Sequence, residues 1–298
     1  MPNPWKLKQE MCEIGRRMYE RGLVSAFEGN LSVRLAPDRL LCTPSLMCKG
    51  YLKPEDLCVV DMSGKQLSGE RKRSSEIFLH LGIYRERPDA QAVVHTHAPH
   101  ATAFAITHTP VPNCITGEVE VFLGEVPLAS YATAGSPEMG EVIAPLVREA
   151  NVVLLANHGV VSHGKSLEEA LHRTEILEAY CRTLILARQL GPVQRLSDQN
   201  MRDLMALKQK LGLPDRRSGA QTFEDCDLYA NNEFGRGFCE SRGSLNLGEA
   251  RPESANEMAE SAAPPLPSQI QSVTSGAPAD VESLVREIAD RVMETVDR

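Results

Sequence analysis

Two apolar runs of this sequence end in histidine. Residues 92–97 finish with His95 and His97, and residues 152–159 contain His158 near their end. Side chains two positions apart on a β-strand point to the same face, so His95 and His97 can bind one metal ion without special backbone geometry. Three neutral imidazoles with an open coordination position are typical of catalytic zinc, whereas structural zinc sites are usually completed by cysteines. The sequence therefore predicts a catalytic metal centre, with half-buried histidines bonded to the backbone as the alternative.

A second group of polar residues, Ser74, Ser75 and Glu76, opens a segment that we expect to be a helix over residues 75–87. The free N–H groups and the positive dipole end at a helix start favour an anion such as phosphate, and two hydroxyls add donors. Glu76 can then act as the fourth metal ligand, or as the acid and base of a reaction. Its alternative role is that of an ordinary capping glutamate.

A third polar segment, residues 28–32, reads Glu-Gly-Asn-Leu-Ser. Gly29 allows a ligand to approach the backbone closely, and the Asn30 amide is a hydrogen-bond donor. This segment is a second candidate anion loop. The alternative is a tight turn into a strand that begins at Leu31.

These side chains require a rigid frame, and the hydrophobic pattern predicts a sheet with helices on its faces. Strands and helices alternate irregularly, without a strict βαβ rhythm, which favours a layered α/β fold. We expect a hairpin turn at Ser63 and Gly64, and an irregular strand region from about residue 107 to residue 128. The expected helices span residues 5–22, 75–87, 101–106, 137–149, 166–190 and 197–211.

The composition excludes several classes of function. The chain has 298 residues, is 42% hydrophobic and carries a formal net charge of −8 without any dense block of Lys and Arg, which argues against nucleic acid as a partner. Its start does not resemble a signal peptide, and no apolar run is long enough to span a bilayer, so we expect a cytoplasmic protein without membrane contact. The eight cysteines lie scattered without a Cys-x-x-Cys pair, which predicts reduced, mostly structural thiols.

The composition changes near Ser241. Residues 241–279 are rich in Ser, Ala, Pro, Gly and Glu, which predicts a flexible, disordered linker. Residues 280–298 place apolar side chains on one stripe of an amphipathic helix. A short helix on a long linker is expected to dock on a partner, or else to pack against its own or a neighbouring subunit.

Several motifs, in order and spacing, resemble the class II aldolase/adducin-head family, and most of all its fuculose-phosphate aldolase branch. The resemblance covers about residues 5–212 and implies a three-layer α/β/α fold with a mostly antiparallel sheet. It also implies a homotetramer with one Zn²⁺, or another divalent metal, per subunit. The implied metal ligands are Glu76, His95, His97 and His158, and the implied phosphate contacts are Gly29, Asn30, Ser45, Ser74 and Ser75. The motifs are residues 29–32, 43–45, 74–76, 93–97, 131–133 and 157–159.

The resemblance implies cleavage of a ketose 1-phosphate, L-fuculose 1-phosphate or L-rhamnulose 1-phosphate, to dihydroxyacetone phosphate and lactaldehyde. The metal would stabilise the charge left on the C2 oxygen, and Glu76 would transfer the proton. The alternatives are a pentulose-phosphate 4-epimerase and a non-catalytic, metal-stabilised scaffold protein. Lys49 is a candidate phosphate contact. The family's two catalytic tyrosines align with Thr116 and Leu211, and the candidates to replace them are Glu118, Tyr131 and Tyr229.

The end of the chain resembles the encapsulation peptides of bacterial microcompartment enzymes. This implies a location in a microcompartment lumen, with residues 280–298 binding shell or core proteins. The resulting division of the chain is an aldolase domain (1–215), an irregular extension (216–240), the linker (241–279) and the amphipathic helix (280–298).

Overall fold

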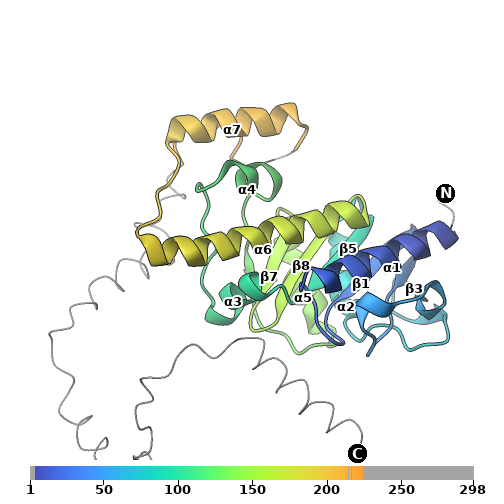
Figure 1. Ribbon diagram of the computed structural model, residues 1–298. Helices are drawn as coiled ribbons and strands as arrows, with labels where there is room; N and C mark the ends of the chain where they lie inside the picture. Colours follow the sequence, from blue (N-terminus) through green and yellow to red (C-terminus); the bar gives the residue numbers. More distant parts are fainter. Residues whose placement is uncertain (1–3, 214, 216, 224–298) are drawn as a thin grey trace, which may run out of the picture. The chain divides into compact units, whose positions relative to one another are not determined.

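The computed structural model describes residues 4–213, 215 and 217–223, and within them one mixed sheet forms the centre of the fold (Figure 1). Eight strands lie in the order β4-β3-β2-β1-β5-β8-β7-β6 in this part of the chain. All neighbours pair antiparallel except β6 and β7, which are parallel. The prediction of a mostly antiparallel sheet is confirmed. The strands are β1 (Asn30–Ala36), β2 (Arg39–Cys42), β3 (Cys58–Asp61), β4 (Gln66–Ser68), β5 (Ala92–Thr96), β6 (Leu128–Ala129), β7 (Val152–Leu155) and β8 (Gly159–Gly164).

Helices cover both faces of the sheet. Alternate side chains of a strand point to opposite faces, and the neighbours Val93 and Val94 on β5 accordingly belong to two different hydrophobic clusters. The cluster of Val94 includes side chains of α1, α3 and α6, and the cluster of Val93 includes side chains of α2 and α5. This confirms the predicted α/β/α layers. The α-helices are α1 (Pro4–Glu20), α2 (Ile77–Glu86), α3 (Pro99–Thr107), α4 (Gly117–Phe122), α5 (Glu138–Val147), α6 (Leu167–Leu190) and α7 (Asp198–Lys210), and short 3₁₀ turns span Lys49–Tyr51 and Pro54–Asp56.

The local signals that define helix ends are also confirmed in most places. Ser166 caps α6 by accepting a hydrogen bond from the backbone nitrogen of Glu169 at 3.1 Å, and Ser197 caps α7 in the same way. The predicted hairpin turn joins β3 and β4, with Gly64 at φ +86°.

Two elements differ from the sequence prediction. Helix α2 begins at Ile77 rather than at Ser75, with Glu76 in the capping position but without a side-chain capping bond. The region predicted as irregular strand contains helix α4, which packs on α7 (Figure 1). Val119 and Val121 are β-branched and alternate with glutamates, which is a strand pattern. Within this helix Glu120 is buried and accepts a hydrogen bond from the backbone nitrogen of Cys114, a tertiary contact that the local alternation does not signal.

Three further predictions concern solubility, thiols and the end of the chain. No helix among the described residues is long and apolar enough to cross a bilayer. Among the described cysteines, Cys114 is disulfide-bonded, so the prediction of reduced thiols is wrong there. The free thiols are those of Cys12, Cys42, Cys48, Cys58 and Cys181. The predicted linker 241–279 and helix 280–298 lie outside the described residues, as does most of the extension 216–240, and the division at residue 215 stays a prediction.

Candidate metal centre and anion pocket

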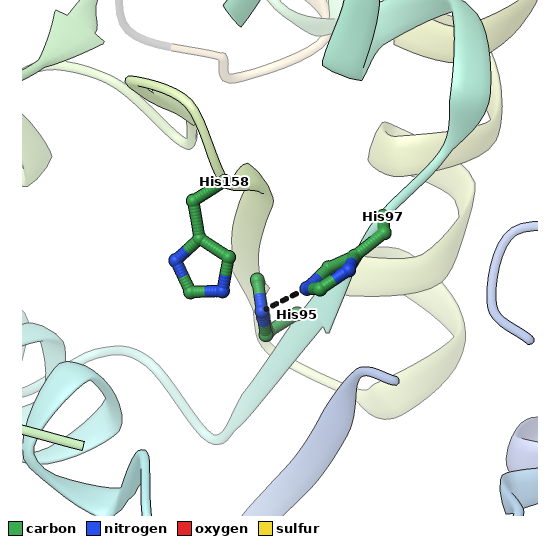
Figure 2. Close-up of side chains that lie close together, drawn as sticks. All are labelled: His95, His97 and His158. Atoms are coloured by element: carbon green, nitrogen blue, oxygen red, sulfur yellow. Dashed lines mark hydrogen bonds between the residues drawn. The ribbon is translucent and has the colours of Figure 1, made fainter. Parts of the chain in front are cut away.

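The three predicted histidines meet at one end of the central strands. His95 lies on β5, His97 directly follows that strand, and His158 lies in the turn between β7 and β8. One ring nitrogen from each imidazole lies within 4.8 Å of the other two, and the rings point toward one another (Figure 2). The Nε2 atoms of His95 and His97 are 3.2 Å apart. The spacing of two in the sequence thus produces the expected pair, and the sheet supplies the third imidazole.

A glycine permits this close arrangement. A Cβ atom added to Gly159 would collide with the carbonyl oxygen of Thr96 and lie 3.0 Å from the His97 ring. Asn157, two residues earlier, has φ +54°, a left-handed conformation that asparagine tolerates better than most residues. The turn between β7 and β8 therefore depends on Asn157 and Gly159 to place His158 beside the pair on β5.

Hydrogen bonds orient the imidazoles. His95 is fully buried, and its Nδ1 donates to the carbonyl oxygen of Val160 at 2.8 Å, which leaves the Nε2 lone pair facing the site. The Nδ1 of His97 faces the Glu28 carboxylate at 3.5 Å, so its Nε2 faces His95. At 3.2 Å the two Nε2 atoms need a proton or a cation between them, because two bare lone pairs would repel each other. A bound metal ion removes this conflict.

The carboxylate of Glu76 lies beside the three histidines. Its carboxylate lies 3.4 Å from Nε2 of His95 and 3.2 Å from Nε2 of His158. The Asn30 amide nitrogen donates to Glu76 Oε2 at 2.6 Å. Without a capping bond of its own, Glu76 does not fit the alternative role of a helix-capping residue.

The protonation states suit metal binding. Burial lowers the pKa of His95 to about 3 and also lowers the pKa of His97, so both imidazoles are neutral. Burial opposes ionisation of Glu76, but the adjacent His95 and His158 and the amide of Asn30 hold its pKa well below the usual value. Neutral imidazoles and an ionised carboxylate are the forms that bind divalent cations, and three nitrogens with one carboxylate oxygen suit zinc.

A cavity of about 560 Å³ opens beside these residues. Its walls include Glu76 and His97, together with two lysines, Lys49 and Lys72. The five residues predicted to contact phosphate also line it: Gly29, Asn30, Ser45, Ser74 and Ser75. A larger cavity of about 710 Å³ runs along α6, but it contains none of the predicted metal ligands or phosphate contacts. We assign the chemistry to the smaller cavity because only there do candidate metal ligands and anion donors meet among the described residues.

The loops around this cavity interlock. Ser45 Oγ accepts from the backbone nitrogen of Ser75 at 2.9 Å and donates to the carbonyl oxygen of Arg73 at 3.0 Å. The loop before β1 lies so close to β5 that a Cβ on Gly29 would be 2.7 Å from the carbonyl oxygen of His95. The start of α2 and the loops around β1 and β2 thus hold the anion donors beside the metal candidates.

Sequence reasoning missed three residues of this site. The carboxylate of Glu28 faces the His97 ring, and Lys72 lines the cavity. The His80 ring, on α2, makes a hydrogen bond with the side chain of Asn30. The position of His80, one helical turn after Glu76, was a usable signal, since residues four apart share a helix face.

The positions that align with the family's tyrosines lie elsewhere in this subunit. Thr116 lies at the N-cap position of α4 without a side-chain capping bond, and Glu118 lines the cavity along α6. Tyr131 is 58% exposed and follows β6. Leu211 follows α7, and Tyr229 lies outside the described residues. No tyrosine lines the 560 Å³ cavity in the part of the chain that the structure describes.

The fold and this site define a class II aldolase. Residues 9–185 match the family "Class II Aldolase and Adducin N-terminal domain", and the chain belongs to that family. The metal dependence of class II aldolases agrees with the group of three imidazoles.

Among its relatives, the 3-oxo-tetronate 4-phosphate decarboxylase of Haemophilus influenzae is 36% identical over 204 residues, which are 66% of this chain and 95% of the relative. The L-fuculose phosphate aldolase of Methanococcus vannielii is 37% identical over 57% of this chain and 91% of the relative. A solved L-fuculose 1-phosphate aldolase superimposes with a TM-score of 0.63 at 33% identity, over 69% of this chain and 96% of that structure. Aldolases and decarboxylases both break carbon–carbon bonds, so the prediction of a lyase is confirmed at that level.

Proposed function

We propose that this protein cleaves a carbon–carbon bond of a phosphorylated ketose or keto acid and releases dihydroxyacetone phosphate. One observation carries the proposal: the cavity lined by the predicted phosphate contacts also contains Glu76 and His97 of the predicted metal centre. A phosphate bound there leaves the substrate carbonyl within reach of the histidines. Phosphate contacts beside a metal centre suit a substrate that has an anionic end and a reacting carbonyl.

The proposed metal ligands are Glu76, His95, His97 and His158, with one Zn²⁺ per subunit as the first ion to test. When bound, the metal supplies a positive charge that stabilises the negative charge developing on the substrate oxygen. The protein provides the rest of the chemistry. Serine hydroxyls, backbone N–H groups and the Asn30 amide orient the phosphate. Glu76, ionised in the free protein, would take up one proton from solvent and pass it from its carboxyl oxygen to the carbon that loses its bond.

The first substrates to test are L-fuculose 1-phosphate and L-rhamnulose 1-phosphate. In both, the C3–C4 bond breaks, the C4 hydroxyl loses its proton to give lactaldehyde, and C3 gains a proton to give dihydroxyacetone phosphate. The aldolase names of the Methanococcus relative and of the similar solved structure support this choice.

The second candidate is decarboxylation of a 3-oxo-tetronate 4-phosphate. Loss of CO₂ from C1 and protonation of C2 would give the same product, dihydroxyacetone phosphate. Decarboxylation has no leaving aldehyde and so needs no group to take a proton from a C4 hydroxyl. The cavity lacks a tyrosine among the described residues, and the Haemophilus relative carries this decarboxylase name.

One set of incubations decides between these functions. The purified protein is incubated separately with L-fuculose 1-phosphate, L-rhamnulose 1-phosphate, 3-oxo-tetronate 4-phosphate and ribulose 5-phosphate, with and without a chelator. The products are identified by mass spectrometry. Lactaldehyde marks the aldolase, CO₂ the decarboxylase, and an isomeric pentulose phosphate the 4-epimerase. If no substrate turned over while metal still raised the melting temperature, the metal-stabilised scaffold would replace the proposal.

We also propose that the protein acts as a homotetramer in the cytoplasm, within a bacterial microcompartment. The apolar stripe predicted for residues 280–298 supports an encapsulation helix carried on a linker. A fluorescent fusion that lacked residues 280–298 and still co-localised with shells would contradict this. The mass in solution, measured by light scattering, tests the tetramer.

A further inference from the structure

A chain of buried hydrogen bonds leads from the metal centre into the protein interior. The Asn30 amide nitrogen bonds Glu76 at 2.6 Å, and its oxygen lies 2.5 Å from Nε2 of His80. Nδ1 of His80 lies 2.6 Å from the hydroxyl of Ser32, which in turn lies 3.0 Å from the hydroxyl of Tyr84. Asn30, Ser32, His80 and Tyr84 are each at most 4% exposed. Neither the proposed metal ligands nor the phosphate contacts account for the inner part of this chain.

The chemistry of Glu76 sets the direction of every bond in the chain. An ionised carboxylate only accepts, so the nitrogen of Asn30 must face it and the oxygen of Asn30 must face His80. His80 must therefore carry its proton on Nε2, which leaves Nδ1 as an acceptor for the hydroxyl proton of Ser32. The Ser32 oxygen then accepts from Tyr84. Each donor has one acceptor, and the opposite tautomer of His80 would place two acceptors against each other at Asn30.

The secondary structure fixes the chain geometrically. Asn30 and Ser32 lie two residues apart on β1, so their side chains share one face of the sheet. Glu76 precedes α2, and His80 and Tyr84 follow at intervals of four, so all three lie on the side of α2 that faces β1. Burial lowers the pKa of His80 to about 4, so the ring stays neutral and keeps a single N–H at neutral pH.

We propose that His80 is a positioning residue that holds the Asn30 amide with its nitrogen toward Glu76 and the cavity. One amide hydrogen then fixes the carboxylate, and the second faces the space where the substrate anion would bind. If the side-chain amide of Asn30 were flipped, its oxygen would face the Glu76 carboxylate and the two would repel each other. This inference rests on the proposed metal centre, and its test uses metal affinity, which needs no substrate.

The test compares His80→Leu with His163→Leu. His163 is also a buried histidine on a neighbouring part of the fold, but it bonds the carbonyl oxygen of Ala150 instead of any site residue. Both variants lose a buried imidazole and should lose stability. Groups that orient metal ligands typically contribute about 10- to 100-fold to metal affinity. We expect that loss of Zn²⁺ affinity, measured by chelator competition, for His80→Leu, and less than a threefold change for His163→Leu.

A double-mutant cycle separates positioning from general damage. If His80 acts through Asn30, the His80→Leu change should weaken zinc binding in the native background but have no further effect in Asn30→Ala. His80→Gln keeps a donor near the position of Nε2 and should restore most of the affinity. Equal effects of His80→Leu in both backgrounds would overturn the proposal.

The tautomer gives an independent spectroscopic test. Nitrogen-15 chemical shifts of the His80 ring should report a proton on Nε2 between pH 6 and pH 8, in the presence and absence of zinc. Ser32→Ala removes the donor to Nδ1 and should shift part of the population to the other tautomer. A proton on Nδ1 in the native protein would contradict the chain direction. If the metal bound elsewhere, zinc would leave the nitrogen shifts of His95 unchanged. That result would contradict the proposed metal centre and not the role of His80.

Discussion

The Lys49 ammonium donates a hydrogen bond to the carbonyl oxygen of Phe27 at 2.9 Å, across 22 residues of sequence. A second bond, at 2.6 Å, reaches the carbonyl oxygen of Met47, and Lys49 is only 1% exposed. Lys49 thus ties the loop that carries Gly29 to the loop that follows Ser45. Both loops line the anion cavity, and the third ammonium proton is available to a ligand there.

Removal of this ammonium should weaken phosphate binding. In Lys49→Met two buried carbonyl oxygens lose their donor, which costs about 1–3 kcal/mol each when no water replaces it. We expect KM for the phosphorylated substrate to rise at least tenfold, with a smaller change in kcat. Steady-state kinetics and urea unfolding measure the two effects. A variant that lost stability but kept its KM would show that Lys49 holds the loops without helping to bind the anion.

The binding of the anion should also depend on pH through Lys49. Burial lowers the pKa of Lys49 to about 8, so the free protein loses this charge as the pH rises above that value. The KM of the native protein should therefore increase above about pH 8. In Lys49→Arg the cation stays charged throughout, and KM should stay flat between pH 7 and pH 9.5. Parallel curves for the two proteins would assign the pH dependence to another group.

The same pKa predicts that stability rises with pH over the range in which substrate binding weakens. Between about pH 8 and the ordinary lysine value of 10.5, Lys49 is neutral in the folded state and protonated in the unfolded state. The unfolded state then binds more protons, so stability rises with pH in this window, by about 1.4 kcal/mol for each unit of pKa difference. The native protein should gain stability relative to Lys49→Met from pH 8 to pH 10, as measured by urea unfolding.

The sequence predicts those parts of the candidate site that depend only on the local spacing of residues. His95 and His97 are two apart on a strand, so their common face follows from strand geometry alone. His158 and Glu76 could be proposed as ligands from a second strand end and from a helix start, but nothing local shows which loops meet, and the family resemblance supported that grouping. The burial of Lys49 depends on the loops that carry Phe27 and Met47. The bond between His80 and Asn30 depends on the packing of α2 against β1, and no period in the sequence encodes a contact across 50 residues.

The edge of the fold was harder to predict for the same reason. The α4 segment has the alternation of a strand, but a buried ion pair between Glu120 and Arg217, at 2.8 Å, joins it to residues almost a hundred positions later. Burial of such a pair requires partners from distant segments. Tertiary contacts therefore override the local preference of Val119 and Val121, and only the folded chain shows it.

Loss of the metal should abolish activity and lower stability together. We expect His95→Ala to bind no zinc at micromolar concentration and to show no turnover, because loss of this fully buried imidazole leaves only two nitrogen ligands. The melting temperature of the native protein should rise with zinc concentration, and that of His95→Ala should not. His172→Ala is the matched control, because His172 is an exposed histidine on α6. Retained turnover in a chelator would exclude a metal-dependent reaction.

Glu76 should be separable into its two proposed roles. Glu76→Gln keeps the shape and can still accept from Asn30, but it cannot transfer a proton. We expect kcat to fall by about 10²- to 10⁴-fold, the usual contribution of a general acid and base. Zinc should still bind through His95, His97 and His158, with lower affinity. The decisive measurement is proton exchange on dihydroxyacetone phosphate in D₂O, followed by NMR. The native protein should exchange one hydrogen of the hydroxymethyl carbon, and Glu76→Gln loaded with zinc should not. If the loaded variant exchanged that hydrogen at the native rate, Glu76 would serve only as a ligand and another group would carry the proton.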